Sequence, residues 1–225
     1  METHEPLAQP VASLSGRGPQ SAKYLEKLGI STVKDLLFHL PLRYEDRTRI
    51  YPINTLTPGM SVLTCGTVEF TEVLLKGKNS LACRISDQTG YLTLKFFHFT
   101  TKQKSNLSPG TLVSCFGEVR HGYQGLEIVH PEYRALDDDR VLTPVEETLT
   151  PVYPTTDGLK QISLRNLTDQ ALIRLQRGQV EELLPANLFD EQYSLAQALA
   201  IIHRPPPEAS TSQLENGKHP AQVRL

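Results

Sequence analysis

The spacing of the hydrophobic residues changes twice along the chain, and this change restricts the fold more than any other feature. Residues 20–40 repeat apolar side chains every three or four positions, which is typical of helices. Between about residues 60 and 130 the repeat is two, as in strands with one buried face. Helical spacing returns from residue 162. We therefore predict an α+β protein in which helices flank a β-domain on both sides.

The β-domain has enough alternating runs for a small barrel. We expect five short antiparallel strands: the runs at 62–75, 80–86 and 91–99, one after Gly110, and one at 126–130. A short connection with helical character, residues 100–108, separates the third run from the fourth. Gly66 and Gly117 lie in mid-strand, where such barrels coil sharply. The pattern matches a five-stranded antiparallel OB-fold barrel, and a small β-sandwich is the alternative.

Three segments follow from these patterns. We expect an N-terminal helical segment at residues 1–55, the OB-fold domain at 56–140, and a proline-rich linker with further helices at 141–225. Pro151 and Pro154 make the linker extended and stiff.

The composition excludes several classes of protein. The chain has 225 residues, of which 39% are hydrophobic and 21% charged, so it can bury a sizeable core without disulfides or metals. No run approaches the roughly 18 apolar residues of a membrane span. The acidic, proline-containing start argues against a signal peptide, and three cysteines without a CxxC pair indicate reduced thiols. We therefore expect a cytoplasmic protein with no membrane partner.

The start of the first helical segment carries a candidate phosphate site. Residues 14–22, LSGRGPQSA, have the glycine spacing of a helix-hairpin-helix element. Backbone N–H groups exposed by Gly16 and Gly18, beside Arg17, can hold a DNA phosphate without reading its sequence. Arg17 stands where an apolar residue is usual, so an ordinary helix start is the alternative.

The run at 91–99 is the most informative, because alternate residues of a strand point to opposite faces. One set is apolar enough for the core: Leu92, Leu94, Phe96 and His98. The other set would point outward: Tyr91, Thr93, Lys95, Phe97 and Phe99. Aromatic rings beside a lysine are the surfaces on which unpaired bases stack. We therefore predict Phe97 and Phe99 as stacking residues; the alternative is that both rings pack beneath a neighbouring helix.

Basic side chains near this run are candidates for phosphate contacts. The predicted set is Lys76, Lys78, Lys95, Lys102, Lys104 and Arg120. Lys76 and Lys78 lie at a hairpin tip, which by itself is an ordinary solvated turn. A separate cluster, residues 43–49, mixes three arginines with two carboxylates. We expect this cluster to pair internally rather than to grip a phosphate backbone.

Signatures of catalysis are missing from the sequence. It has no G-x-S-x-G elbow and no HExxH motif. Gly217-Lys218 is followed by His219, not by the hydroxyl residue that a phosphate-binding loop needs to hold Mg²⁺. The acidic triplet 137–139 has the character of a solvated turn. We predict no catalytic residue, cofactor or metal site within this chain.

At several long motifs the chain resembles the N-terminal part of RecG, a family of bacterial ATP-dependent DNA helicases. The resemblance covers residues 12–225. It rests on HLPLRYEDRT at 39–48, ISD at 85–87 with KFF at 95–97, HPEY at 130–133, ETLTPVYPTT at 147–156, HRPPP at 203–207 and HPAQ at 219–222.

The resemblance implies a function for the β-domain. In that family this region is a wedge domain, an OB-fold that binds the branch point of stalled forks and Holliday junctions while two C-terminal motor domains pull duplex. The family's stacking aromatic maps onto Phe97. A second aromatic of some members would fall at Thr101, so we expect a single platform, or Phe99 as a substitute.

The resemblance also implies a division of labour. The family's ATP-binding motifs lie beyond the last residue of this sequence, so ATP and Mg²⁺ belong to motor domains in cis. We expect a fragment that binds branched DNA and does not hydrolyse ATP by itself. The alternative function is an OB-fold protein-interaction module in which Phe97 and Phe99 bury against a partner or a later domain.

Overall fold

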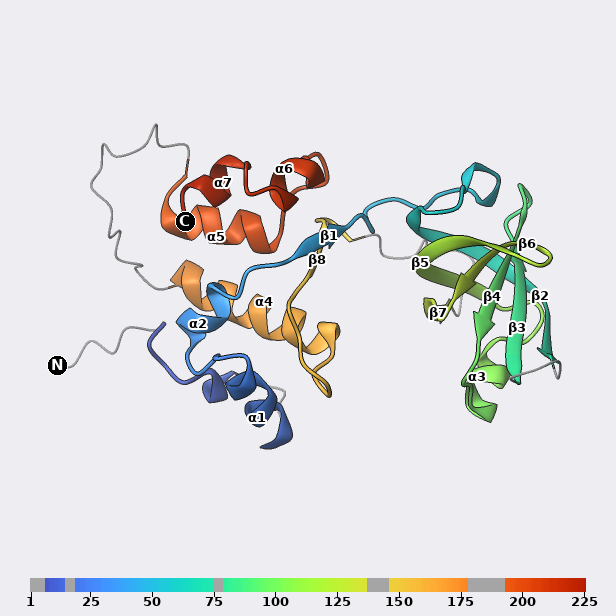
Figure 1. Cartoon of the computed structure of the whole chain (residues 1–225), viewed down its shortest axis with the longest axis horizontal. Helices are drawn as coiled ribbons and strands as arrows, with labels where there is room; N and C mark the ends of the chain where they lie inside the picture. Colours follow the sequence, from blue (N-terminus) through green and yellow to red (C-terminus); the bar gives the residue numbers. More distant parts are fainter. Residues whose placement is uncertain (1–6, 15–18, 75–78, 137–145, 178–192) are drawn as a thin grey trace. The chain divides into compact units, whose positions relative to one another are not determined.

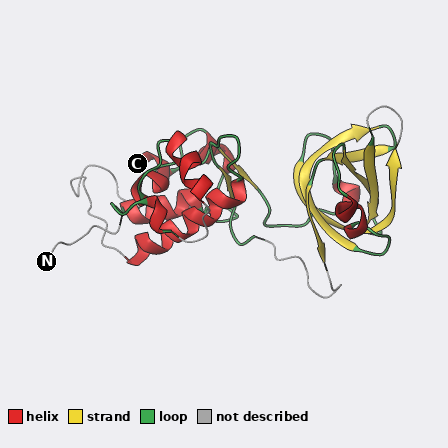
Figure 2. Ribbon diagram, turned by 90° about the horizontal axis from the view of Figure 1, so that it is seen from below, coloured by secondary structure: helices red, strands yellow, loops and turns green. Residues whose placement is uncertain are grey.

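The computed structural model describes residues 7–14, 19–74, 79–136, 146–177 and 193–225. The chain divides into two compact units. The helical unit combines Met1–Tyr44 with Leu149–Leu225, and the β unit is the continuous stretch Glu45–Thr148. Figure 2 shows most of the helices gathered in one unit and most of the strands in the other. The predicted α+β class is therefore confirmed.

The helical unit is built mainly from short helices. Its elements are η1 (Val11–Ser13), α1 (Pro19–Lys27), α2 (Val33–Leu37), α4 (Gln161–Arg177), α5 (Leu195–His203), α6 (Thr211–Glu215) and α7 (Pro220–Val223) (Figure 1). The strands β1 (Arg43–Glu45) and β8 (Thr150–Val152) pair with each other. Within the described ranges, no helix has the length and apolar character that crossing a membrane requires.

Local sequence explains where α2 begins. The Thr32 hydroxyl accepts a hydrogen bond from the Asp35 backbone N–H (3.1 Å), and the Asp35 carboxylate accepts one from the Thr32 N–H (2.8 Å). This capping box satisfies two of the donors that a helix start leaves without a partner. The same backbone hydrogen bond from Thr32 lowers the pKa of Asp35.

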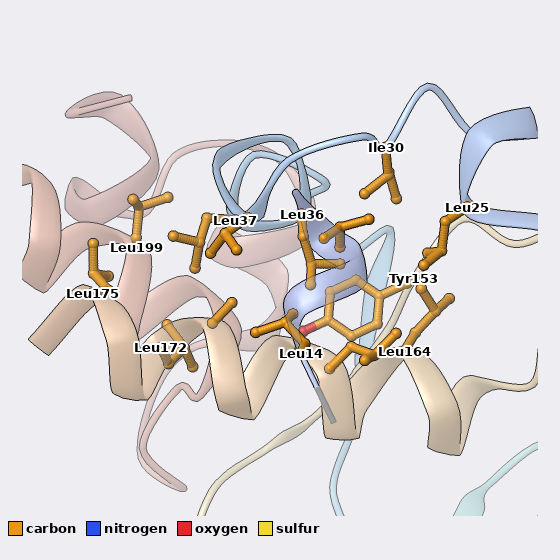
Figure 3. Packing of buried hydrophobic residues seen from close by; sticks show 14 of the residues in the cluster. Leu14, Leu25, Ile30, Leu36, Leu37, Tyr153, Leu164, Leu172, Leu175 and Leu199 are labelled. Carbon is orange, nitrogen blue, oxygen red and sulfur yellow. The ribbon is translucent and has the colours of Figure 1, made fainter. Parts of the chain in front are cut away.

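The core of the helical unit joins segments that are far apart in the sequence. Figure 3 shows Leu25, Leu36 and Leu37 from the N-terminal segment packed with Tyr153 and Leu164 from the C-terminal one. Because both segments contribute, neither alone can complete this core.

A buried polar chain crosses the core of the helical unit. The His203 ring donates from Nε2 to the Leu37 carbonyl (2.8 Å) and accepts at Nδ1 from the Tyr153 hydroxyl (2.9 Å). Burial lowers the pKa of His203 to about 4. The imidazole is therefore neutral near pH 7, in the tautomer that this chain of bonds requires.

The β unit is a six-stranded sheet with one helix in its connections. The elements are η2 (Ile53–Thr55), β2 (Ser61–Leu74), β3 (Ser80–Ser86), β4 (Tyr91–Phe96), α3 (Thr101–Asn106), β5 (Leu112–Gly122), β6 (Gly125–Val129) and β7 (Glu132–Leu136). The strand order is β2-β3-β4-β6-β5-β7, and β2 also pairs with β5. The pairings therefore form a circuit that begins and ends at β2: from β2 to β3, β4, β6 and β5, and from β5 back to β2.

Two parts of the sheet prediction were wrong. The sheet has six strands instead of five, and the β4–β6 pair is parallel, so the sheet is mixed rather than antiparallel. The sixth strand, β7, is only five residues long and follows β6 almost directly. Alternation reveals which residues face inward along one strand, but it does not reveal which strand lies alongside or in which direction. The helical connection predicted at 100–108 is confirmed by α3.

The interior of the β unit explains the two mid-strand glycines. A Cβ atom at Gly66 would lie 2.9 Å from the Ser86 carbonyl oxygen, and one at Gly117 would clash with the Ile128 side chain. Both positions therefore need glycine for close approach of neighbouring strands. The enclosed core includes Leu81, Ile85, Leu92, Leu94, Val113 and Ile128, all nearly inaccessible to solvent.

Candidate nucleic-acid interface

Two adjacent phenylalanines at the end of β4 lie in different environments. Phe96 is the last residue of the strand, is 3% exposed, and packs its ring edge-on against Tyr133, with centroids 5.5 Å apart. Phe97 follows it and is 37% exposed. The predicted assignment of Phe96 to the core and Phe97 to the outside is confirmed. An exposed ring is thus fixed at the end of a strand whose other face is buried.

The Phe97 ring has two defined neighbours. The Lys95 Nζ atom lies 5.4 Å from the ring centroid, and the His130 ring lies 5.7 Å away at an angle of 56°. The Phe97 backbone N–H donates to His130 Nε2 (3.4 Å), while the His130 N–H donates to the Lys95 carbonyl (2.8 Å). These bonds tie the residues after β4 to the end of β6, so the ring is held from two strands.

Two assignments beyond Phe97 were wrong. His98 is exposed, although alternation predicted it in the core, and Phe99 is partly buried and packs against the core of the β unit. The reason is that β4 ends at Phe96, so a period of two no longer applies. The chain turns here into α3, whose first turn is capped by the Thr100 hydroxyl accepting from the Gln103 N–H (3.1 Å).

The predicted cations differ in how far their charge is already compensated. Lys95 pairs with Glu127 (3.6 Å) and Arg120 with Glu118 (2.9 Å). A hydrogen bond to Glu118 raises the pKa of Arg120. Lys102 and Lys104 lie on α3 and are exposed, and within the described part of the chain neither ammonium group forms an ion pair. Among the predicted cations that the structure describes, the uncompensated charge is therefore on α3, which begins four residues after Phe97.

Several predicted contacts cannot be placed. Gly16, Arg17 and Gly18 of the helix-hairpin-helix-like start, and Lys76 and Lys78 of the hairpin tip, lie outside the described residues.

In the mixed cluster at 43–49, Arg47 and Arg49 pair with carboxylates of the cluster, as predicted. Arg47 forms ion pairs with Glu45 and Glu132 (both 2.7 Å), and its guanidinium lies 4.0 Å from the centroid of the Phe116 ring. Arg49 pairs with Asp46 (2.6 Å). Because these two guanidinium groups already have carboxylate partners, their ion pairs act as a structural tie within the β unit.

Sequence reasoning missed two groups on the outside of the β unit. One is His130, which contacts Phe97 although 33 residues separate them. The other is the set Phe70, Arg84 and Tyr91, in which the guanidinium lies between two exposed rings. Tyr91 belonged to the outward set of its strand, and this was the one available signal. The partners on β2 and β3 could not be found without the register of the sheet.

The described residues contain no group of three or more side chains suited to holding a metal ion.

Comparison with known proteins gives consistent matches. A family model described as the RecG wedge domain matches residues 10–175. The ATP-dependent DNA helicase RecG of Escherichia coli K12 is 48% identical over 219 residues, which cover 97% of this chain and 31% of that protein. The RecG of Haemophilus influenzae is also 48% identical, over 218 residues, with the same coverage. The chain therefore spans less than a third of the length of these curated relatives.

A solved structure supports the same grouping. The structure of RecG bound to a three-way DNA junction superposes with a TM-score of 0.69 at 28% identity, over 89% of this chain and 27% of the other.

Proposed function

We propose that this chain, which belongs to the RecG wedge domain family, binds branched DNA as part of an ATP-dependent DNA helicase. Its substrates are replication forks and Holliday junctions, and its processes are DNA recombination and repair. The wedge region holds the branch point and separates the arms. Motor domains in cis, which hold ATP and Mg²⁺, supply the movement. The setting is the cytoplasm.

The observation that carries this proposal is the exposed ring of Phe97 beside the buried ring of Phe96. The first unpaired base at a branch point has lost one stacking neighbour, and an aromatic side chain can replace it. Phe97 offers such a ring, fixed by bonds to two strands. A linear duplex has no free base face, so this contact selects branched DNA.

The lysines of α3 complement the ring. Lys102 and Lys104 follow Phe97 within seven residues and carry uncompensated charge, so they are suited to the phosphates next to the stacked base. Lys95 and Arg120 have carboxylate partners and play a smaller part. Gly16, Arg17, Gly18, Lys76 and Lys78 stay proposed backbone contacts. Phe99 packs against the core of the β unit, so we do not propose it as a stacking ring.

We also infer that the β unit is an OB-fold. The returning circuit of five pairings supports this, as does the position of α3 between β4 and β5, the third and fourth of these five strands in chain order. In the proposed division, the wedge domain is residues 56–140, a segment that lies within the β unit. Residues 1–55 precede it, and residues 141–225 lead towards the motor.

The test is a fork-binding titration with Phe97→Ala. Base stacking on an aromatic side chain is worth roughly 1–3 kcal/mol, so fork affinity should fall by about 5- to 150-fold. Affinity for linear duplex and the melting temperature should stay unchanged. Phe38→Ala is the matched control, because Phe38 is an exposed phenylalanine of the helical unit. An equal loss on fork and duplex would contradict stacking on an unpaired base, and no loss on either would favour a protein-interaction module.

A further inference from the structure

A second group of exposed rings lies on the outside of the β unit, around the end of β4 that is opposite to Phe97. The Arg84 guanidinium lies 4.2 Å from the centroid of the Tyr91 ring and 5.9 Å from that of the Phe70 ring. Tyr91 is 57% exposed and Phe70 is 37% exposed. Arg84 also pairs with Glu69 (3.6 Å). We call Phe70, Arg84 and Tyr91 the β3 stack.

The register of the sheet builds the β3 stack from three strands. A β-bulge between Val68 and Phe70 shifts the pairing so that Phe70 stands directly opposite Arg84. Arg84 in turn stands opposite Thr93 on β4. Tyr91 is two residues before Thr93 and therefore points to the same face. The bulge thus places a ring beside the guanidinium.

The β3 stack is continuous with the proposed branch-point site. Tyr91, Thr93 and Lys95 share one face of β4, and Phe97 follows directly after the strand. At about 3.3 Å per residue, the six steps from Tyr91 to Phe97 span roughly 20 Å. An OB-fold covers on the order of 4–16 nucleotides of single-stranded DNA, so one DNA strand can reach both ends of this face.

We propose that the β3 stack is a second base-stacking site, which binds unpaired bases of a single-stranded DNA arm a few nucleotides from the branch point. This rests on the proposed function. Rings and planar guanidinium groups both present faces on which bases stack. The Glu69 carboxylate neutralises Arg84, so the stack binds bases and not phosphates. The exposed phenol of Tyr91 provides the open face.

The test measures how affinity depends on the length of the single-stranded arm. Forks with no single-stranded arm, and with arms of about 4, 8 and 16 nucleotides, are titrated with the full chain. Wild type should bind more tightly as the arm grows to about 8 nucleotides, and Tyr91→Ala should reduce this gain by about 5- to 150-fold. Tyr91→Phe keeps the ring and should keep the gain. Arg84→Lys keeps the positive charge but removes the planar guanidinium group, and should lose part of the gain in affinity.

The outcomes separate this proposal from the proposed function. Phe97→Ala should weaken binding at every arm length, including none, whereas Tyr91→Ala should act on the longer arms alone. If wild type shows no gain with arm length, or if Tyr91→Ala leaves the gain intact, the second site is wrong and the branch-point site stands. A β3 stack that served a protein partner would give this result. If wild type does not prefer forks to duplex, the proposed function itself fails.

Discussion

The two units of this chain differ in how the sequence supplies their hydrophobic cores. The β unit is one continuous stretch, and its core comes from strands that follow one another closely. The helical unit is assembled from two stretches that are separated by the whole β unit. Its core also encloses a polar chain, from the Tyr153 hydroxyl through His203 to the Leu37 carbonyl.

Because of this difference, we expect the DNA binding of the protein and the pH dependence of its stability to lie in different units. The β unit carries most of the proposed DNA contacts on its outside, above a core in which Leu92, Leu94 and Phe96 alternate with outward residues. Its stability is set by apolar packing. The helical unit depends also on the protonation state of one buried imidazole. Changes in packing, pH and salt should therefore act on different parts of the molecule.

The largest effect is expected from truncating the core ring of the β unit. Phe96→Ala should destabilise this unit by about 3–5 kcal/mol, because a buried aromatic is replaced by a cavity. Phe97→Ala, one residue away, should leave stability nearly unchanged. Hydrogen-exchange mass spectrometry distinguishes the units, and the loss of protection for Phe96→Ala should be confined to residues 45–148. Lost protection in the helical unit as well would mean that the two units unfold together.

The opposite behaviour of Phe96 and Phe97 could be predicted from the sequence, because a strand with one buried face imposes a period of two. The prediction failed at His98 and Phe99, since nothing in the alternation marks the end of β4. The cap at Thr100 was the available signal.

Contacts between distant segments could not be predicted in this way. His130 lies beside Phe97 because β6 runs parallel to β4, and Arg84 lies between two rings because a bulge shifts β2. The core of the helical unit includes both Leu25 and Tyr153, although the whole β unit lies between them in the sequence. Periodicity describes one element at a time, whereas these arrangements depend on register and topology. The function was instead indicated by long motif blocks, which need no knowledge of neighbours.

An intermediate effect is expected from pH, and we expect it in the helical unit. The pKa of His203 is about 4 in the folded protein and about 6.5 when unfolded. Between these values the unfolded state binds more protons, so stability falls as the pH drops from about 6.5 towards 4. Above this window His203 adds no further dependence on pH. At about 1.4 kcal/mol per pH unit, the total loss is about 3 kcal/mol.

Urea titrations followed by far-ultraviolet circular dichroism at several pH values measure this loss. His203→Phe removes the titrating group, so its stability should depend less on pH between about 5 and 6.5, a window largely above the titration of ordinary carboxylates. His121→Gln is the control, because His121 is an exposed histidine of the β unit. If the wild-type slope persists in His203→Phe, another group is responsible.

The smallest effect is expected from salt, and it tests where the β unit meets phosphates. Each lysine that neutralises a phosphate releases counterions and adds about 0.7–0.9 to the slope of log affinity against log salt. Lys102 and Lys104 have no carboxylate partner among the described residues, so the full increment applies to them. Arg120 already has Glu118, and its binding to a phosphate would free a glutamate beside the DNA.

We therefore expect the double variant Lys102→Ala with Lys104→Ala to lower the slope for fork binding by about 1.4–1.8. Between about 50 and 200 mM salt, its affinity should fall about tenfold less than that of wild type. Arg120→Ala should change the slope less than either lysine. Lys160→Ala, an exposed lysine of the helical unit, should not change it. Fluorescence anisotropy at four salt concentrations gives all of these slopes.

Equal effects of Arg120→Ala and of one lysine would mean that the ion pair with Glu118 opens on DNA. An effect of Lys160→Ala as large as that of Lys102→Ala would mean that the helical unit contacts phosphates as strongly as the β unit does, and the contrast between them would be lost.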